Sequence, residues 1–249
     1  MSTRDVVQDI VKHTAGLGFI TAVKVTGSDS ETTLDAMDAD RTVIMQAKLH
    51  NAEKDFSGEF GLGNLGFLSG VTSLPNYQTD DATVEVVTRE RNGTITPDHL
   101  LFKDTENNTD QYRFMSKEII EQTLQTVKFK GVEWDVTFEP TKAKVAELQA
   151  LAGIYGGIEP NFTVKTEDSN LIVTVGAADG SFTGKRTFAN NVNGSINQGF
   201  AWPLVQVLAI LKLGMSGHCV MQISSKGALM ISVDSGIGKY DYILPALTV

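Results

Sequence analysis

Hydrophobic residues along this chain recur with two different periods. In four segments they follow the 3.6-residue period of a helix. These segments are 3–17, 61–74, 140–155 and 201–213. Ser2 or Thr3 can cap the first segment, and a proline stands in the first turn of the third and of the fourth. The pattern therefore predicts four helices.

Between these helices, period-two alternation or an excess of β-branched residues predicts strands. In the first half they are 22–26, 32–38, 41–49, 83–89, 99–103 and 111–115. In the second half they are 133–138, 161–166, 170–176, 182–188, 218–224, 228–233 and 239–244. The helix midpoints are spaced by about 57 residues in one half and about 60 in the other, so the chain has the pattern of an internal repeat.

The repeat predicts an α+β protein with two similar domains, 1–116 and 132–249, joined by a connector at 117–131. The connector mixes apolar and charged residues and contains no glycine or proline before its last residue. We expect it to run extended along a surface.

Composition restricts the class of protein. The chain has 249 residues, 41% hydrophobic and 20% charged, which is typical of globular domains and excludes disorder. The formal net charge of -9 argues against a protein that coats nucleic acid by bulk attraction. The single cysteine, Cys219, permits neither an intramolecular disulfide nor a structural zinc site, which favours a cytoplasmic location.

No targeting or membrane segment is visible in the sequence. The N-terminus has acids where a signal peptide needs an apolar run. The most apolar stretch, 200–211, is far shorter than the roughly 20 residues of a membrane span. We therefore expect no contact with a membrane.

Two kinds of enzyme have little support in the sequence. Gly61, Gly63 and Gly66 form a GxGxxG pattern, but the preceding segment, 55–60, is too polar for the buried strand of a dinucleotide site. The four histidines lack ligand spacing, and neither GxSxG nor HExxH occurs. We expect no catalytic residue, cofactor or metal. A β-rich structural protein of a phage or virus, without a role on DNA, stays open as an alternative, although regularly spaced helices do not favour it.

Three segments carry a resemblance to a known family. They are TTLDAMDADRTVIMQAKL at 32–49, DFSGEFGLGNLGFLSGVTSL at 55–74 and KYDYILPAL at 239–247. In this order they resemble the early hairpin, the second helix with its preceding strand, and the last strand of the DNA polymerase sliding clamps of the proliferating cell nuclear antigen type. The acidic balance, and a chain that ends directly after the last strand, are most similar to the clamps of T-even-like bacteriophages.

The resemblance implies a DNA clamp fold. Each of the two domains would pack two helices on antiparallel sheets, and three copies would close into a ring around duplex DNA. Such a clamp is a processivity factor that binds DNA topologically, without sequence preference. Its implied partners are the replicative DNA polymerase and an ATP-driven clamp loader. If the protein is phage-encoded, it would work in the host cytoplasm.

The family's DNA-facing helices imply a set of cationic contacts. On the first helix Arg4, Gln8 and Lys12 form one stripe opposite the apolar positions. The implied DNA-binding residues are Arg4, Lys12, His13, Lys142, Lys144 and Lys212. From the residues alone, an ordinary solvated helix face explains the stripe equally well.

The resemblance also implies two protein-binding regions. The expected docking pocket for partner peptides comprises Met37, Arg41, Ile44, Ile119, Ile120, Leu124, Tyr242, Ile243, Pro245 and Leu247. The expected contact between subunits pairs strand 110–115 of one copy with strand 181–188 of the next. Its residues are Asp110, Tyr112, Phe114, Phe182, Lys185 and Arg186.

Overall fold

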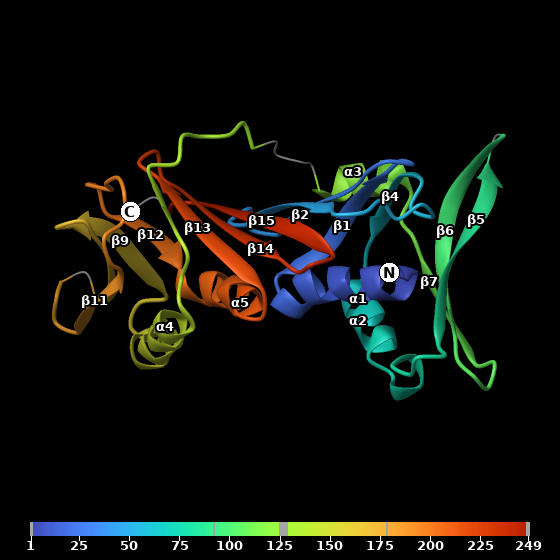
Figure 1. Ribbon diagram of the computed structural model, residues 1–249, viewed down its shortest axis with the longest axis horizontal. Coiled ribbons are helices and arrows are strands. Elements are labelled where there is room, and N and C mark those ends of the chain that lie inside the picture. Colours follow the sequence, from blue (N-terminus) through green and yellow to red (C-terminus); the bar gives the residue numbers. More distant parts are fainter. Residues whose placement is uncertain (1, 92, 125–128, 178, 248–249) are drawn as a thin grey trace. The chain divides into compact units, whose positions relative to one another are not determined.

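The computed structural model of the chain describes residues 2–91, 93–124, 129–177 and 179–247 (Figure 1). Contacts divide the chain into two compact units. Unit 1 comprises Met1–Lys128 with Gly236–Tyr240, and unit 2 comprises Phe129–Ser235 with Asp241–Val249. The last strand therefore begins in unit 1 and ends in unit 2.

Unit 1 consists of a helix, four strands, a helix, three strands and a further helix. Its first part contains α1 (Thr3–His13), the 3-10 turn η1 (Ala15–Leu17), β1 (Ile20–Gly27), β2 (Thr32–Asp38), β3 (Ile44–Leu49) and β4 (Gly58–Leu62). Its second part contains α2 (Leu65–Thr72), η2 (Pro75–Tyr77), β5 (Thr83–Arg91), β6 (Thr94–Lys103), β7 (Thr109–Arg113) and α3 (Lys117–Leu124).

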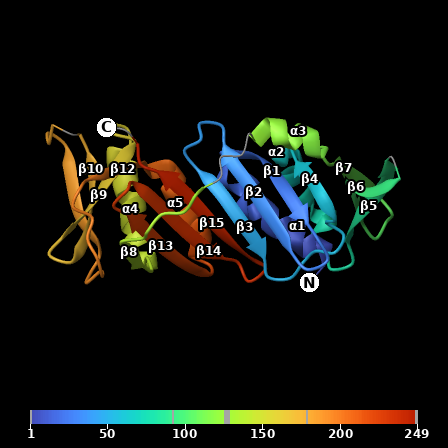
Figure 2. The same cartoon turned by 90° about the horizontal axis from the view of Figure 1, so that it is seen from above.

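Two antiparallel sheets make up most of unit 1. Strands β4, β1, β2 and β3 lie side by side in that order, and the start of β15 (Gly238–Pro245) follows β3 (Figure 2). Strands β5, β6 and β7 form the other sheet. Helices α1 and α2 lie on one face of the first sheet and α3 lies on the opposite face (Figure 1). One antiparallel bridge, Gly61 to Met115, connects β4 to the residues after β7.

Unit 2 repeats this plan. Its elements are β8 (Val136–Phe138), α4 (Lys142–Tyr155), β9 (Asn161–Glu167), β10 (Asn170–Gly176), β11 (Thr183–Ala189), β12 (Phe200–Pro203), α5 (Leu204–Gly214), β13 (His218–Ser224), β14 (Ala228–Asp234) and the rest of β15. The order β12, β9, β10, β11 matches β4, β1, β2, β3, and β13, β14, β15 correspond to β5, β6, β7. A bridge from Ala201 to Leu247 repeats the bridge from Gly61 to Met115. The expected α+β class with two similar halves is confirmed.

Several predicted elements begin later than expected, and in two of them a specific contact explains the shift. The strand expected from residue 41 starts at Ile44, because the Asp38 carboxylate closes a turn by accepting hydrogen bonds from the Val43 amide at 2.8 Å and the Thr42 hydroxyl at 2.5 Å. The helix expected from residue 201 starts at Leu204, because residues 200–203 pair with β9 instead.

The prediction of an extended connector is wrong over its first half. Residues 117–124 form helix α3, whose Ile120 and Leu124 side chains pack with Ala22 of β1 in a buried cluster. An amphipathic pattern that can bury two large apolar residues favours a helix over an extended surface strand. Residues 125–128 of the expected connector lie outside the described part of the chain.

The helix expected at 61–74 is shorter than predicted, because its first residues belong to a strand. Gly61 belongs to strand β4, and α2 begins only at Leu65. A side chain at Gly61 would collide with Ile120, and one at Gly63 would collide with Met115. These glycines of the GxGxxG pattern therefore permit close packing in unit 1. Over the described ranges, no helix is long and apolar enough to cross a bilayer.

Candidate functional site

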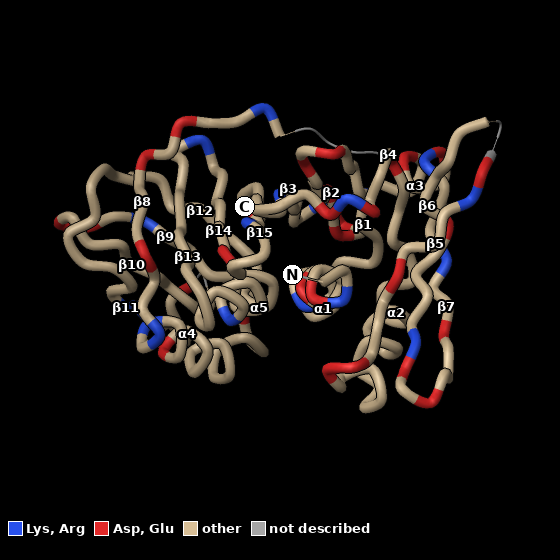
Figure 3. Tube along the Cα trace, turned by 45° about the vertical axis from the view of Figure 1, so that its right-hand side comes forward, with Lys and Arg blue, Asp and Glu red and all other residues tan. Residues whose placement is uncertain are grey.

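Helix α1 presents the first group of expected DNA contacts. Ser2 and Asp5 form a capping box at its start, with hydrogen bonds of 3.2 Å and 2.8 Å, and its apolar face is buried. Lys12 lies exposed near its end. The Arg4 guanidinium donates hydrogen bonds to the backbone carbonyls of Thr79 and Ala82, so it also fixes the loop before β5. Figure 3 shows acidic and basic residues interspersed along this helix.

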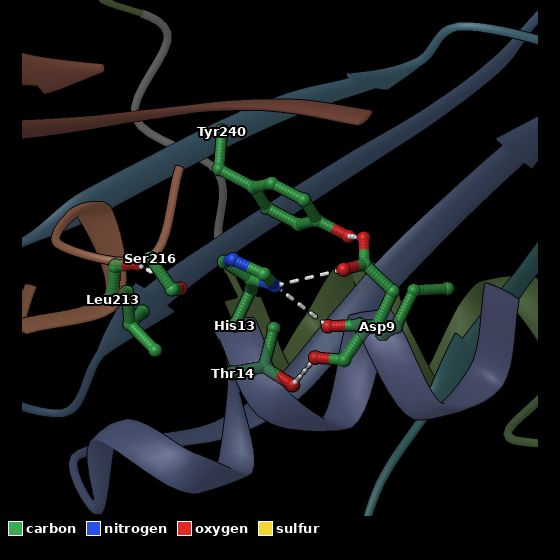
Figure 4. Close-up of polar contacts among 7 residues, drawn as sticks. Asp9, His13, Thr14, Leu213, Ser216 and Tyr240 are labelled. Atoms are coloured by element: carbon green, nitrogen blue, oxygen red, sulfur yellow. Dashed lines mark hydrogen bonds and ion pairs between the residues drawn. The ribbon is translucent and has the colours of Figure 1, made fainter. Parts of the chain in front are cut away.

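His13 does not reach the surface, which corrects its expected role as a DNA contact. Its side chain is 1% exposed and its ring stacks on that of Tyr240, with centroids 4.2 Å apart (Figure 4). Nδ1 lies 2.8 Å from the Asp9 carbonyl and 3.3 Å from the Asp9 carboxylate. Tyr240 donates to that carboxylate as well, at 2.7 Å. This buried group belongs to the packing of unit 1.

The remaining expected DNA contacts lie on the helices of unit 2. Thr141 caps α4 by accepting a hydrogen bond from the Lys144 amide, and Lys142 is exposed in the first turn. The Lys144 ammonium is 2.8 Å from the Glu147 carboxylate, so part of its charge is compensated. Lys212 is exposed in the last turn of α5, whose side chains are otherwise mostly buried. Positive charge on these helices is sparse.

The expected docking residues divide into surface and core. Met37 and Ile44 pair across the β2–β3 hairpin and are half-buried, and Arg41 is exposed at its turn with φ of 58°. Ile119 is 52% exposed on α3. These four side chains are accessible to a partner.

Four other expected docking residues are buried, which corrects their predicted role. Ile120 and Leu124 lie in the cluster beneath α3, and Tyr242 and Ile243 are enclosed in the core, with exposed fractions of at most 4%. Tyr242 and Ile243 are consecutive in β15, so their side chains point to opposite faces, and both faces of the strand are covered there. The sequence did not show which of them would be covered.

The chain end of unit 2 forms a crevice of about 470 Å³. Pro245 is exposed and Leu247 half-buried, and both line the crevice together with Phe200 and Lys226. The Leu247 amide donates a 2.9 Å hydrogen bond to the Ala201 carbonyl, and Trp202 donates from its indole to the Leu244 carbonyl at 3.1 Å. These bonds hold the tail against β12.

The two strands expected at the subunit contact are edge strands of their sheets. β7 ends the order β5, β6, β7, and β11 ends the order β12, β9, β10, β11. Lys185 and Arg186 on β11 are exposed, and Phe182 just before it is 64% exposed. Lys185 pairs with Glu167, and the Arg186 guanidinium is 3.5 Å from the Glu147 carboxylate.

On β7 and directly after it, two of the expected side chains are not available for a partner, which corrects their role. Tyr112 and Phe114 are buried within unit 1, and Tyr112 donates to the Gly63 carbonyl. Burial raises the pKa of the Tyr112 phenol. Asp110 is half-buried and accepts a 2.7 Å hydrogen bond from Tyr77. Only the backbone edge and the outward side chains of β7 remain for an intermolecular contact.

Sequence reasoning missed the apolar residues that flank these two edges. Phe67 on α2 is 47% exposed and stacks on Tyr112. Ile154 on α4 is 67% exposed, and Ile158, just after that helix, is 50% exposed. A helical pattern shows which residues are apolar, but it does not show which of them the tertiary structure leaves uncovered. Large exposed apolar side chains of this kind often mark contacts with another protein.

Comparison with known proteins gave matches at the level of structure. No family model and no curated protein sequence matches the chain. A structure of the C-terminal region of FEN-1 bound to A. fulgidus PCNA matches with a TM-score of 0.71 and 10% identity, over 100% of this chain and 97% of that one. Proliferating cellular nuclear antigen from Entamoeba histolytica matches with a TM-score of 0.68 and 13% identity, over 98% and 94%. PCNA from Thermococcus kodakaraensis matches with a TM-score of 0.68 and 11% identity, over 99% and 98%. The chain therefore has the PCNA-like clamp fold along its entire length.

Proposed function

We propose that this protein is a sliding clamp, a processivity factor that encircles duplex DNA and tethers a replicative DNA polymerase. The observation that carries the proposal is the end-to-end agreement with PCNA structures, which extends over both repeated units. Under this proposal, an ATP-driven complex loads the clamp onto DNA. The clamp itself has no catalytic residue, metal or cofactor. The acidic composition supports a closer relation to the clamps of T-even-like phages, acting in the host cytoplasm.

Ring closure would pair β7 of one copy with β11 of the next. Both are edge strands, and an exposed strand edge is a template for pairing with another chain. Head-to-tail pairing of two different edges generates a closed ring when the rotation allows it. In unit 1, the start of β15 pairs with β3. In the internal repeat β15 corresponds to β7, and β3 corresponds to β11. Pairing of β7 with β11 between two copies would therefore repeat this arrangement.

Apolar and charged side chains beside the edges support this contact. Phe182 is exposed directly before β11, and Phe67 is exposed and stacks on Tyr112 of β7. Ile154 is exposed on α4, which packs against β11, and Ile158 is exposed just after that helix. Lys185 and Arg186 on β11 provide positive charge. Asp110 on β7 and Glu106 in the preceding loop provide negative charge. Charge complementarity of this kind fixes the register of an interface.

DNA contact would be weak and directed at phosphates. Lys12, Lys142 and Lys212 are exposed on three helices, and their small number fits a protein that slides without reading bases. Retention would then depend on topology. Encircling converts repeated dissociation of the polymerase into tethered diffusion, which keeps its local concentration at the primer end high.

Partner docking would use the accessible members of the expected pocket. These are Met37, Arg41, Ile44, Ile119, Pro245 and Leu247. A few apolar anchors in a pocket provide much of the affinity of a small interface. One of the matching structures contains the C-terminal region of FEN-1 bound to a PCNA.

Two measurements test the proposal together. Light scattering should give a mass of about 81 kDa, three times the 26.9 kDa of the chain. After loading, the protein should remain on nicked circular DNA and leave the same DNA within the dead time of the assay once it is linearised, because only topology holds it. A monomer at high concentration, or equal retention on both DNAs, would refute the proposal.

A further inference from the structure

Unit 1 contains a crevice of about 340 Å³ between its two sheets. Strand β4 contributes Glu59 and Phe60, and the start of β6 contributes Asp98. The segment between β7 and α3 contributes Phe114 and Lys117. The rings of Phe60 and Phe114 pack at 4.4 Å as part of an apolar floor. The volume is within the usual range of ligand pockets, about 300–1,000 Å³.

This crevice occupies the same place in unit 1 as the Pro245 and Leu247 crevice does in unit 2. The latter is lined by residues 198–200 at the start of β12, residues 226–227 before β14, and residues 245–247 at the end of β15. Its counterpart is lined by the start of β4, the start of β6 and the residues after β7. The bridges from Gly61 to Met115 and from Ala201 to Leu247 are also equivalent. The internal repeat has therefore produced two versions of one crevice.

A strand edge faces the crevice of unit 1. Gly61 and Met115 exchange two backbone hydrogen bonds, of 2.9 Å and 2.8 Å. In an antiparallel ladder every second residue directs its amide and carbonyl to the same side, so Glu59 is the next residue on this edge. The ladder stops there because the opposite chain turns into α3 at Lys117. An extended peptide could continue the ladder by adding a strand to β4.

The charges of the two crevices differ. In unit 1 the charged lining residues are Glu59, Asp98, Glu118 and Lys117, and in unit 2 the charged lining residue is Lys226. The ammonium groups of Lys24, 2.8 Å away, and of Lys117, 3.2 Å away, hold the pKa of the Glu59 carboxyl below its usual value. Hydrogen bonds from His99 and Arg113, both of 3.0 Å, do the same for Asp98. Both carboxylates are therefore negative at neutral pH.

We propose that the crevice of unit 1 binds an extended, basic peptide segment of a partner protein. The segment pairs with the backbone of Glu59 and places a lysine or arginine side chain among the carboxylates of Glu59, Asp98 and Glu118. The apolar floor receives the aliphatic part of that side chain. This site goes beyond the proposed function, since none of the proposed docking residues lines the crevice.

The test uses the full-length protein and two labelled five-residue peptides with blocked ends, Val-Arg-Val-Lys-Val and Val-Glu-Val-Glu-Val. Fluorescence anisotropy measures affinity, and hydrogen exchange locates the protected amides. We expect the basic peptide to bind and to slow exchange at residues 57–61. Glu118→Lys, at an exposed position, should weaken this binding about tenfold, the factor expected for one charged hydrogen bond. Asp29→Lys reverses an exposed carboxylate in the turn between β1 and β2, outside the crevice, and should leave the affinity unchanged.

Three results would overturn the inference: no binding of the basic peptide at millimolar concentration, equal binding of the acidic peptide, or no effect of Glu118→Lys. The mass and the DNA retention of the same preparation separate this result from the proposed function. A trimer that stays on circular DNA but fails the peptide test disproves the crevice alone. A monomer that passes the peptide test disproves the clamp alone.

Discussion

The phenol of Tyr240, on β15, donates a 2.7 Å hydrogen bond to the carboxylate of Asp9, on α1, across 231 residues of sequence. His13 lies beside both residues, with its ring stacked on that of Tyr240. Asp9 is 8% exposed and the other two side chains are at most 1% exposed. A buried carboxylate is costly unless donors surround it, so the three side chains stabilise the structure as a group.

Tyr240→Phe should therefore destabilise the protein by about 1–3 kcal/mol, because it removes one donor from a buried carboxylate and leaves the packing of the ring intact. Urea unfolding measures this change. Tyr155→Phe, at a half-buried tyrosine of α4, is the matched control and should change the free energy of unfolding by less than about 0.5 kcal/mol. Equal losses in the two variants would show that the Asp9 contact contributes little.

Phe182→Asp should dissociate the proposed trimer. The side chain is 64% exposed beside the edge strand β11, and a charge there would have to be desolvated in the subunit contact. The mass from light scattering should fall toward 26.9 kDa, with an unchanged far-UV spectrum. Ile95→Asp, at a 68% exposed position in β6, serves as control and should leave the mass at three chains. A trimer that persists in Phe182→Asp would exclude this edge from the interface.

Replacing Lys142 and Lys144 by alanine should shorten the time that the loaded protein stays on nicked circular DNA. Each lysine that contacts a phosphate adds about 0.9 to the salt slope of binding, so the slope should fall by up to about 2. Because Lys144 already pairs with Glu147, it should contribute less to the salt slope than Lys142 does. Lys48→Ala, at a 65% exposed lysine of β3, is the control, and the mass should not change in either variant. Equal retention in all three proteins would remove α4 from the DNA contact.

Asp98→Asn should lower stability at neutral pH by about 1–3 kcal/mol and have less effect in acid. The folded-state pKa of Asp98 is lowered by its hydrogen bonds from His99 and Arg113. A depressed pKa contributes stability above the unfolded value, near 3.8, and this contribution is lost as the pH falls through the folded value. The gap between wild type and variant in urea unfolding should shrink from pH 7 to pH 3. The exposed Asp81→Asn should show little change at either pH, and a constant gap for Asp98→Asn would contradict the assignment.

The sequence by itself determined the repeated plan of helices and strands. Apolar periodicity is a local property, and it located the helices at α1 and α4 and most of the strands. The sequence also contained the segments that resemble a clamp. Its errors occurred where a tertiary contact competes with a local preference, as at Phe200–Pro203, which pairs with β9 instead of starting the helix.

Only the tertiary structure decided which of the named residues a partner can reach. His13, Ile120, Leu124, Tyr242 and Ile243 satisfy the same local patterns as exposed residues do, but packing within the chain buries them. The two crevices could not be predicted either, because each is formed by three segments that are far apart in the sequence. Burial and cavities depend on long-range packing, whereas a sequence pattern records only the preference of each residue for one face of its own element.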